Sequence, residues 1–423
     1  MKKKIVLISS VFFFALLLVG VNSCKDDEAD FILEALVSGT IDMNAATPPN
    51  NVPADATIEA TFSVDVDAAT VTAATITLVR DYDAASIPLT FSVAGKKVTI
   101  TPGEDLGNGA LYVLSFNAGI KSTDGQEIQP FTRAFSTEGN FLPSGVVAYW
   151  NFDDNLTEQI NGASPTGVVD LTYEDSYKPS AGKAGKFNGT STIVEYANGD
   201  QLMNTSDFTL SFWVKAKSAG HVNENGDPKG HFVIGLGAFY GFQFELFGDY
   251  KGFKMAVQFD YGDGTSGTGG DLEYNGDGLT LANGGWQGTT FCKEDNALDA
   301  VLKDKWFHIT YTYNSVSKER SMFLNGELVK TQDHDLWYDD EGNPMKELGI
   351  VGLKYAGVEP EVLNELAFGF IQSRGGTLWA SVPWGGYDFP TANHFGGWLD
   401  DVRIFHKALT PTEIDLMYQS EKP

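Results

Sequence analysis

Basic residues and cysteines are scarce in this sequence, and the imbalance of charge already argues against one class of partner. The 423 residues include 29 Lys and Arg against 56 Asp and Glu, so the formal net charge is −27. Such a surface repels the phosphate backbone of nucleic acids, and we expect no nucleic-acid partner. Only two cysteines, Cys24 and Cys292, and six histidines occur in the chain.

Catalytic signatures are missing as well. The sequence holds no Gly-x-Ser-x-Gly elbow and no His-Glu-x-x-His zinc motif. Its histidines form no ligand pair at i,i+2 or i,i+4. Retaining glycosidases need two carboxyl groups about 5–5.5 Å apart. Glu245 and Asp249 in "FELFGDY" lack the Glu-x-Asp-x-x-Glu spacing of sandwich-fold glycosidases. We therefore expect that the protein is not an enzyme.

The chain begins with a pattern that is typical of secretion. Basic residues 2–4 precede an apolar run over 5–21, and Asn22-Ser23-Cys24 follows. Residues 1–23 resemble a bacterial lipoprotein signal peptide, and this resemblance implies that Cys24 is acylated. An uncleaved membrane anchor is the alternative, because the apolar run is nearly long enough to span a bilayer.

An acidic tether over residues 24–33 follows the signal. Its "KDDE" at 25–28 resembles the surface-export tag of Bacteroidetes lipoproteins. The resemblance implies a surface-exposed protein held to the cell outer membrane by a lipid anchor. With Cys24 acylated, no internal disulfide can form. We expect Cys292 to be a half-buried apolar residue, since Lys293 alone gives little support for a reactive thiol.

Residues 34–138 are predicted to form a first β-domain. Ile58, Ala60 and Phe62 alternate with polar positions, which is typical of a half-buried strand. Roughly seven such strands, separated by turn clusters, fit an immunoglobulin-like sandwich. The arrangement "ATFSVDVDAATV…VTITPGEDLGNGALYVLSFNAGIKSTDGQEI…FSTEGN" resembles bacterial Ig-like domains of surface proteins. The resemblance implies a spacer, and residues 139–144 form a linker after it.

Residues 145–423 carry a second resemblance. The segments "AYWNFDDN", "GKFNGTSTIVEY", "DFTLSFWVKA", "WFHITYTY", "MFLNGELV" and "GWLDDVRIFHKALTPTEI" follow, in order, the pattern of laminin-G-like (concanavalin A-like) domains. The resemblance implies a two-sheet jelly roll in which the opening strand lies beside the closing one. The expected fold is therefore all-β, an Ig-like sandwich followed by a larger concanavalin A-like sandwich.

A polar sheet surface is expected in this second domain. In the strands predicted near 240–247 and 252–259, Gln243, Glu245 and Lys254 share one face. Lectin sandwiches can carry ligands on a surface of this type. The alternative is a solvated face with a Glu245–Lys254 cross-strand pair.

Acidic residues flank both the opening and the closing strand. If these strands are neighbours, the acids converge at one end, where a Gly-containing turn could add a carbonyl oxygen. Hard oxygen ligands suit Ca²⁺, and the laminin-G-like resemblance implies a structural Ca²⁺ in many such domains. The predicted ligand set is Asp153, Asn188, Gly189, Asp400 and Asp401. The alternative is that Asp401 pairs with Arg403 and that Asp153 belongs to a simple turn.

Two long segments, 261–299 and 335–393, exceed what a lectin sandwich needs, and long loops on a rigid scaffold often carry function. The first is rich in Gly and Asp and contains Trp286, and the second holds several aromatic residues. An aromatic ring offers a platform to the apolar face of a sugar. The predicted ligand-binding residues are Trp379, Trp384, Tyr387, Trp286 and Trp337. Covering the edge of the core is the alternative role. The remaining tryptophans are assigned to packing: Trp150, Trp213, Trp306 and Trp398.

These observations favour a surface lipoprotein that binds an extracellular glycan as an accessory to polysaccharide uptake. Two alternatives stay open. One is an adhesin that binds a protein partner, and the other is a hydrolase or lyase acting on polysaccharide. Fold and cellular address alone do not fix function.

Overall fold

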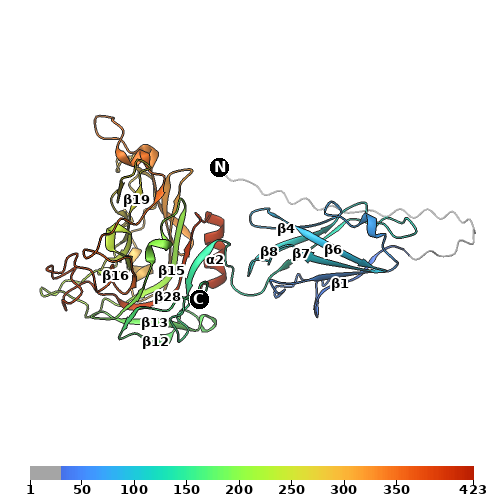
Figure 1. The fold of residues 1–423 in the computed structure, drawn as a ribbon, viewed down its shortest axis with the longest axis horizontal. Coiled ribbons are helices and arrows are strands. Elements are labelled where there is room, and N and C mark those ends of the chain that lie inside the picture. The colour runs from blue at the N-terminus through green and yellow to red at the C-terminus, as the bar shows by residue number, and fades with distance from the viewer. Residues whose placement is uncertain (1–29) are drawn as a thin grey trace, which may run out of the picture.

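The computed structural model describes residues 30–423 and shows two β-domains joined by a short connection (Figure 1). The predicted signal, Cys24 and most of the tether lie outside the described residues. The predicted all-β class is confirmed, since the only α-helices in 30–423 are α1 (Leu298–Leu302) and α2 (Pro411–Glu421). Within that range, no helix has the length and apolar character needed to cross a membrane.

The first domain packs two antiparallel sheets face to face, in the strand orders β2-β1-β3-β7-β6 and β5-β4-β8-β9. The strands are β1 (Leu33–Ser38), β2 (Ile41–Asp42), β3 (Ile58–Phe62), β4 (Ile76–Arg80), β5 (Ser86–Ile87), β6 (Leu89–Ala94), β7 (Lys97–Pro102), β8 (Leu111–Phe116) and β9 (Phe131–Ser136). Ile58, Ala60 and Phe62 are fully buried, as their alternation predicted. The rings of Phe62 and Phe116 meet edge to face between the sheets, with centroids 6.2 Å apart.

The second domain is a larger sandwich. One sheet has nine strands in the order β12-β13-β28-β15-β23-β24-β25-β22, with β10 also paired to β28. Its strands are β10 (Val146–Trp150), β12 (Thr172–Asp175), β13 (Lys183–Asn188), β15 (Phe208–Ala216), β22 (Thr289–Cys292), β23 (Phe307–Asn314), β24 (Glu319–Leu324), β25 (Glu327–Asp333) and β28 (Gly396–Phe405).

The opposite sheet has seven strands in the order β11-β14-β27-β16-β17-β18-β21. Its strands are β11 (Gly167–Val169), β14 (Ile193–Tyr196), β16 (His231–Leu236), β17 (Phe242–Leu246), β18 (Phe253–Val257), β21 (Leu272–Tyr274) and β27 (Leu366–Phe368). A small sheet of β19 (Phe259–Asp260), β20 (Ser266–Gly267) and β26 (Gly352–Leu353) flanks it. Phe212 of one large sheet meets Phe244 of the other at a centroid distance of 5.0 Å, so the core lies between them.

The opening and closing strands of this domain are neighbours, as expected. β10 runs antiparallel to β28, with Ala148 opposite Ile404 and Trp150 opposite Val402. All four side chains are buried. The Asn325-Gly326 turn between β24 and β25 has positive φ at both residues, 52° and 78°, as a type I′ hairpin requires.

Helix α2 lies at the junction of the two domains (Figure 1). Thr410 and Glu413 form a capping box, and Pro411 occupies the first turn. The backbone N–H of Phe141 in the linker donates to Ser420 Oγ at 3.0 Å. Met417 belongs to an apolar cluster that continues into the core of the first domain. The C-terminal helix therefore packs against both units.

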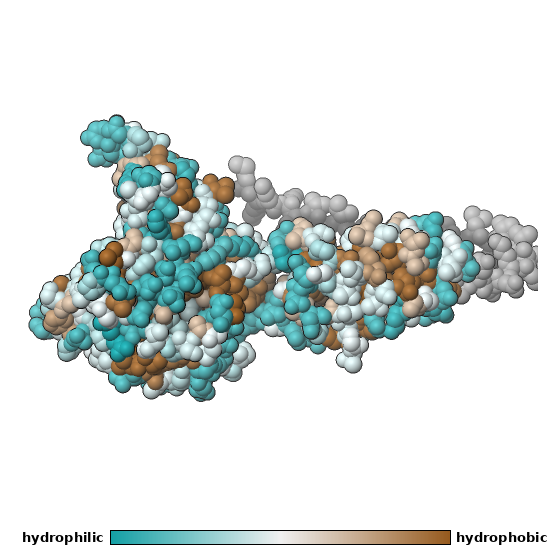
Figure 2. Space-filling view, viewed as in Figure 1, coloured by the Kyte–Doolittle hydropathy of each residue, from teal (hydrophilic) through white to brown (hydrophobic). Residues whose placement is uncertain are grey.

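The face of the molecule shown in Figure 2 is largely polar. Figure 2 shows hydrophilic and intermediate residues over most of one face, with hydrophobic residues in small separate groups. Cys292 is 6% exposed, more buried than expected, and its thiol donates to Asp277 at 3.4 Å.

Candidate functional site

A polar floor forms on the outer face of the seven-stranded sheet, where alternation predicted it. Glu245 of β17 stands directly opposite Lys254 of β18. Lys254 Nζ lies 3.5 Å from Glu245 Oε1 and 2.9 Å from Asp271 Oδ2, so one ammonium group bridges two carboxylates. Gln243 donates to Glu245 at 2.6 Å. Burial raises the pKa of Glu245, although the nearby Lys254 favours its charged form.

An aromatic wall rises beside this floor. The rings of Trp379 and Trp384 lie 5.0 Å apart between centroids at 49° to each other, and Phe239 lies 5.8 Å from Trp379. Trp384 is 46% exposed, a large value for an indole. The ring therefore keeps much of its surface available to a ligand.

The loop holds these rings through its own backbone. Trp379 has a φ of 58°, and its carbonyl accepts from Val382 N at 2.8 Å. A side chain at Gly385 would place Cβ 3.0 Å from the Cβ of Trp379, a tight contact that would require a small shift. Asn393 N donates to the carbonyl of Trp384 at 3.0 Å. Local glycine and two backbone hydrogen bonds thus fix the aromatic wall above the sheet.

The floor and the wall enclose a cavity of about 430 Å³. We call it the tryptophan cavity, and its lining residues are Phe232, Phe239, Gln243, Glu245, Lys254, Thr268, Asp271, Trp379, Trp384 and Asn393. It combines apolar ring faces with paired charges and amides, which can accept from and donate to hydroxyl groups. Such a lining matches a ligand that has both an apolar face and several hydroxyls.

The two other predicted tryptophans border a neighbouring cavity of about 590 Å³. Trp286 and Trp337 meet edge to face with centroids 4.4 Å apart. Trp286 is 44% exposed, whereas Trp337 is 2% exposed and supports it from below. Asp271 lines both cavities, so the two tryptophan pairs share a border.

Tyr387 does not line either of these cavities. Its hydroxyl donates to the carbonyl of Ser191 at 2.5 Å, and its own carbonyl accepts from His394 Nε2 at 2.8 Å. Its ring meets Phe370 edge to face at 5.6 Å. Tyr387 therefore anchors the loop that carries Trp379 and Trp384.

The residues predicted to hold Ca²⁺ are not brought together as one ligand set. A β-bulge at Asp401, with φ of 47°, sets two residues of β28 against one of β15. Both oxygens of Asp401 are engaged at 2.5 Å, one by Tyr149 and one by Tyr177. Arg403 lies 3.1 Å from the same carboxylate. Asp401 thus belongs to a buried charge network, as the alternative foresaw.

Three other residues of the predicted set also have hydrogen-bond partners within the protein. Burial and the adjacent Asp401 raise the pKa of Asp400, which accepts from the Ser176 hydroxyl. Asp153 accepts from Lys183 N at 2.8 Å. The amide oxygen of Asn188 accepts three backbone N–H groups in its own turn. Within residues 30–423 no group of three or more His, Cys, Asp or Glu could hold a metal ion. The three aspartates of the predicted set therefore do not form such a group, and calcium binding stays a prediction.

Comparisons with known proteins identify similar domains and similar solved structures. Residues 37–137 match the family of bacterial Ig-like domains, so the first domain is one. No curated protein matches the chain. Solved structures resemble it at 14–16% identity. They include the receptor-binding domain of botulinum neurotoxin type G, with a TM-score of 0.38 over 65% of this chain and 51% of that one.

Two further structures have the same level of similarity. The binding domain of paraclostridial mosquitocidal protein 1 gives a TM-score of 0.41 over 65% of this chain and 52% of that one. The botulinum neurotoxin serotype D ligand-binding domain, solved with N-acetylneuraminic acid, gives 0.40 over 66% and 51%. The chain thus spans about half the length of the chains it matches. At these scores the similarity carries no conclusion about ligand. What the comparisons establish is that residues 37–137 form a bacterial Ig-like domain.

Proposed function

We infer that this protein binds a glycan through the tryptophan cavity of its second domain and does not act as an enzyme. One observation carries the proposal. The exposed ring of Trp384 and the ring of Trp379 stand over a floor of Glu245, Lys254 and Asp271 in a single cavity. Side chains that are far apart in the sequence thus form one amphipathic surface.

The chemistry of the cavity suits a sugar ring. A pyranose has an apolar C–H face that stacks on indole, while its hydroxyls need both donors and acceptors. Lys254 is flanked by two carboxylates, so the floor offers acceptor oxygens beside an ammonium donor. Asn393 adds an amide at the edge. The volume of about 430 Å³ lies within the range of small-ligand pockets.

The proposal includes a cellular location that the sequence supports. The signal pattern and the acidic tag around Cys24 favour a lipid-anchored protein on the outer face of the outer membrane. The Ig-like domain then separates the sandwich from the membrane. Glycan capture at this distance would serve polysaccharide uptake.

Glycan-array binding followed by calorimetry with the best ligand tests the proposal. We expect Trp384→Ala to weaken affinity by about 1–3 kcal/mol, the loss that base–aromatic stacking shows on truncation. Trp286→Ala is the matched control, because it removes an equally exposed indole from the neighbouring cavity. Equal affinity of wild type and the Trp384→Ala variant would show that the tryptophan cavity is not the glycan-binding site. An array without hits, together with capture of a defined extracellular protein, would favour the adhesin.

One observation favours a second function, a polysaccharide hydrolase or lyase. Burial raises the pKa of Glu245 in a cavity that also contains Asp271, and such shifts cluster at catalytic sites. Release of reducing ends or unsaturated products from the array's best polysaccharide tests it. We expect none, since Lys254 contacts both carboxylates. Turnover that is abolished in Glu245→Gln would establish the enzyme.

A further inference from the structure

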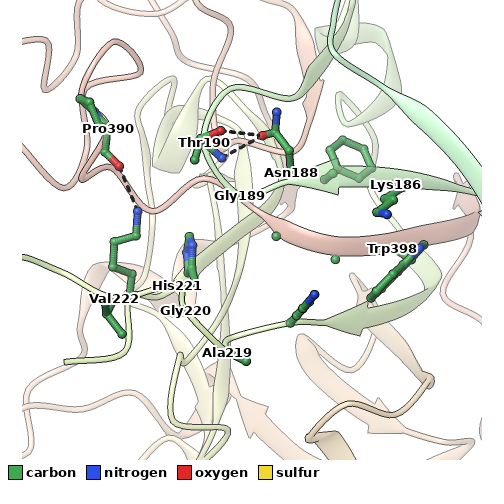
Figure 3. A pocket seen from close by; sticks show the side chains of 15 residues that line it. Lys186, Asn188, Gly189, Thr190, Ala219, Gly220, His221, Val222, Pro390 and Trp398 are labelled. Atoms are coloured by element: carbon green, nitrogen blue, oxygen red, sulfur yellow. Dashed lines mark hydrogen bonds between the residues drawn. The ribbon is translucent and has the colours of Figure 1, made fainter. Parts of the chain in front are cut away.

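A second cavity, of about 480 Å³, is shown in Figure 3. Its lining comes from β13 and β28 of the nine-stranded sheet and from loop residues that include Lys217, His221 and Pro390. Figure 3 shows Trp398 at one end and Pro390 at the other, with His221 between them. None of its lining residues lines the tryptophan cavity, so the two are separate sites.

Strand register explains why a hollow forms here. Trp398 of β28 lies between Lys186 of β13 and Lys215 of β15. Cross-strand partners project from the same face, so a lysine stands on each side of the indole. Their ammonium groups lie 5.8 and 5.0 Å from the centre of the ring.

The next position on the same face is a glycine. Gly396 pairs with Asn188, and its carbonyl accepts from Lys217 N at 2.8 Å. Because Gly396 has no side chain, the sheet surface is open between Asn188 and Lys217. A Cβ there would lie 3.3 Å from the Cα of Gly189. Two glycine backbones therefore form the floor beside Trp398.

The charge of this cavity is opposite to that of the protein. Its lining includes Lys186, Lys217 and Lys229 but no carboxylate, although the chain has a net charge of −27. Glu174 lies nearby, but Lys186 donates to it at 2.5 Å and the Trp398 indole at 2.9 Å. Lys217 takes part in none of the ion pairs formed within residues 30–423. Its ammonium is free to pair with an anion.

The side of the cavity opposite Trp398 contains a hydrogen-bond acceptor, His221, and a loop held in place by Lys229. His221 Nε2 donates to the carbonyl of Gly230 at 3.2 Å, which leaves Nδ1 as the acceptor nitrogen. Burial lowers the pKa of His221 to about 4, so the ring is neutral near pH 7. Lys229 donates to the carbonyls of Pro390 and Ala392 at 3.2 and 2.9 Å and thereby holds the rim.

We propose that this cavity, which we call the lysine cavity, binds an acidic sugar residue, a pyranose that carries a carboxylate or a sulfate. The anion pairs with Lys217, the apolar face of the ring packs on Trp398, and a hydroxyl donates to His221 Nδ1. A free inorganic anion uses only the first of these contacts. A peptide that consists of acidic residues alone, such as polyglutamate, supplies no hydroxyl. The combination of a cation, an indole and a neutral imidazole therefore selects a saccharide.

Calorimetry on the purified protein tests the proposal with two probes, an oligogalacturonate and a chondroitin sulfate oligosaccharide. The first carries carboxylates alone, and the second carries carboxylates and sulfates. We expect at least one of them to bind, and to bind more weakly as salt is raised. The methyl ester of the oligogalacturonate and polyglutamate are expected to bind at least about tenfold more weakly than the acid. Binding of neither probe would overturn the proposal, and so would equal binding of polyglutamate.

Variants locate the site. Lys217→Ala is expected to weaken binding about tenfold, since it removes a charge-assisted hydrogen bond. Lys303→Ala is the matched control, because it removes the same charge from an exposed position outside the cavity. Trp398→Ala tests the stacking contact, with a melting curve to show that it folds. Lys217→Glu, at an exposed position, reverses the charge without touching the core.

The same variants distinguish binding at the lysine cavity from binding at the tryptophan cavity. Trp384→Ala should leave binding of the acidic probe unchanged. If Trp384→Ala abolishes it while Lys217→Ala and Lys217→Glu bind as wild type, the lysine cavity is not the site. Failure of glycan binding at the tryptophan cavity would not change the expected result here, since the cavities share no residue.

Discussion

The two domains of this protein are both β-sandwiches, yet they bury very different side chains. In residues 30–138 the buried polar side chains are Ser38, Ser122 and Thr137, and none of them is charged. The second domain buries His308, Arg403 and many other ionisable groups. All eight tryptophans and all six histidines also lie there. Buried polar groups are costly unless they are partnered. The second domain therefore depends on partnered buried charges for its stability, and the first does not.

Removing one charge from the buried network should produce the largest effect. Arg403 lies 3.1 Å from Asp401 and 2.7 Å from Glu421, all at most 6% exposed. Arg403→Met leaves two buried carboxylates without their cationic partner, and we expect a loss of about 3–5 kcal/mol in the free energy of unfolding. Tryptophan fluorescence during denaturation measures it, because every tryptophan reports on the second domain.

The matched change in the first domain is Arg80→Met. Arg80 pairs with Asp83 at 2.6 Å, but both side chains are partly exposed. Exposed pairs contribute about 0–1 kcal/mol, so a much smaller loss is expected. Equal losses at Arg80 and Arg403 would contradict the contrast between the domains.

The stability of the first domain should instead depend on a glycine whose backbone conformation and close contacts exclude a side chain. Gly109 has a φ of 62°, and a Cβ there would lie 2.4 Å from the backbone nitrogen of Phe141 in the linker. We expect Gly109→Ala to cost about 2–4 kcal/mol through strain and steric overlap. Far-UV circular dichroism during denaturation follows it. Gly125→Ala is the control, since φ is 85° and nothing lies within 4 Å. A larger loss at Gly125 would refute the steric explanation.

Acid should weaken the second domain through its buried imidazoles. Burial lowers the pKa of His308 to about 3, whereas the unfolded chain has a value near 6.5. Between these values the unfolded state binds more protons, so stability is complete above pH 6.5 and is lost as pH falls. At pH 5 the loss from this one group is about 2 kcal/mol.

A variant isolates this contribution. His308→Gln should make the free energy of unfolding less dependent on pH between 7 and 5, and His406→Gln, at an exposed position, should not. The raised pKa values of Asp400 and Glu421 act with the opposite sign, but all three proteins keep them. Identical pH profiles for wild type and His308→Gln would show that the pH dependence of unfolding does not come from His308.

The features that the sequence predicted correctly are those that repeat along a strand or lie in a short turn. Alternation identified Ile58, Ala60 and Phe62 as core, and it placed Glu245 opposite Lys254. The pairing of β10 with β28 followed from the ordered laminin-G-like segments. The first two depend on local periodicity, which one sequence contains, whereas the strand pairing was implied by the resemblance.

The site residues were harder to predict because loops and bulges set their positions. A single extra residue at Asp401 directs its carboxylate into a buried network instead of a cation site. Trp398 was assigned to packing but lines the lysine cavity, since Gly396 leaves the sheet open beside it. Tyr387 fell outside the tryptophan cavity because its hydroxyl reaches Ser191. No periodic pattern in residues 335–393 records these tertiary contacts.

Affinity electrophoresis of a Trp379→Ala/Trp384→Ala double variant tests the central claim most directly. In gels that contain the best glycan from the array, wild type and Trp286→Ala should be retarded. The double variant should run as it does without glycan, with an unchanged unfolding transition. Retardation of the double variant equal to that of wild type would show that the tryptophan cavity does not bind glycan.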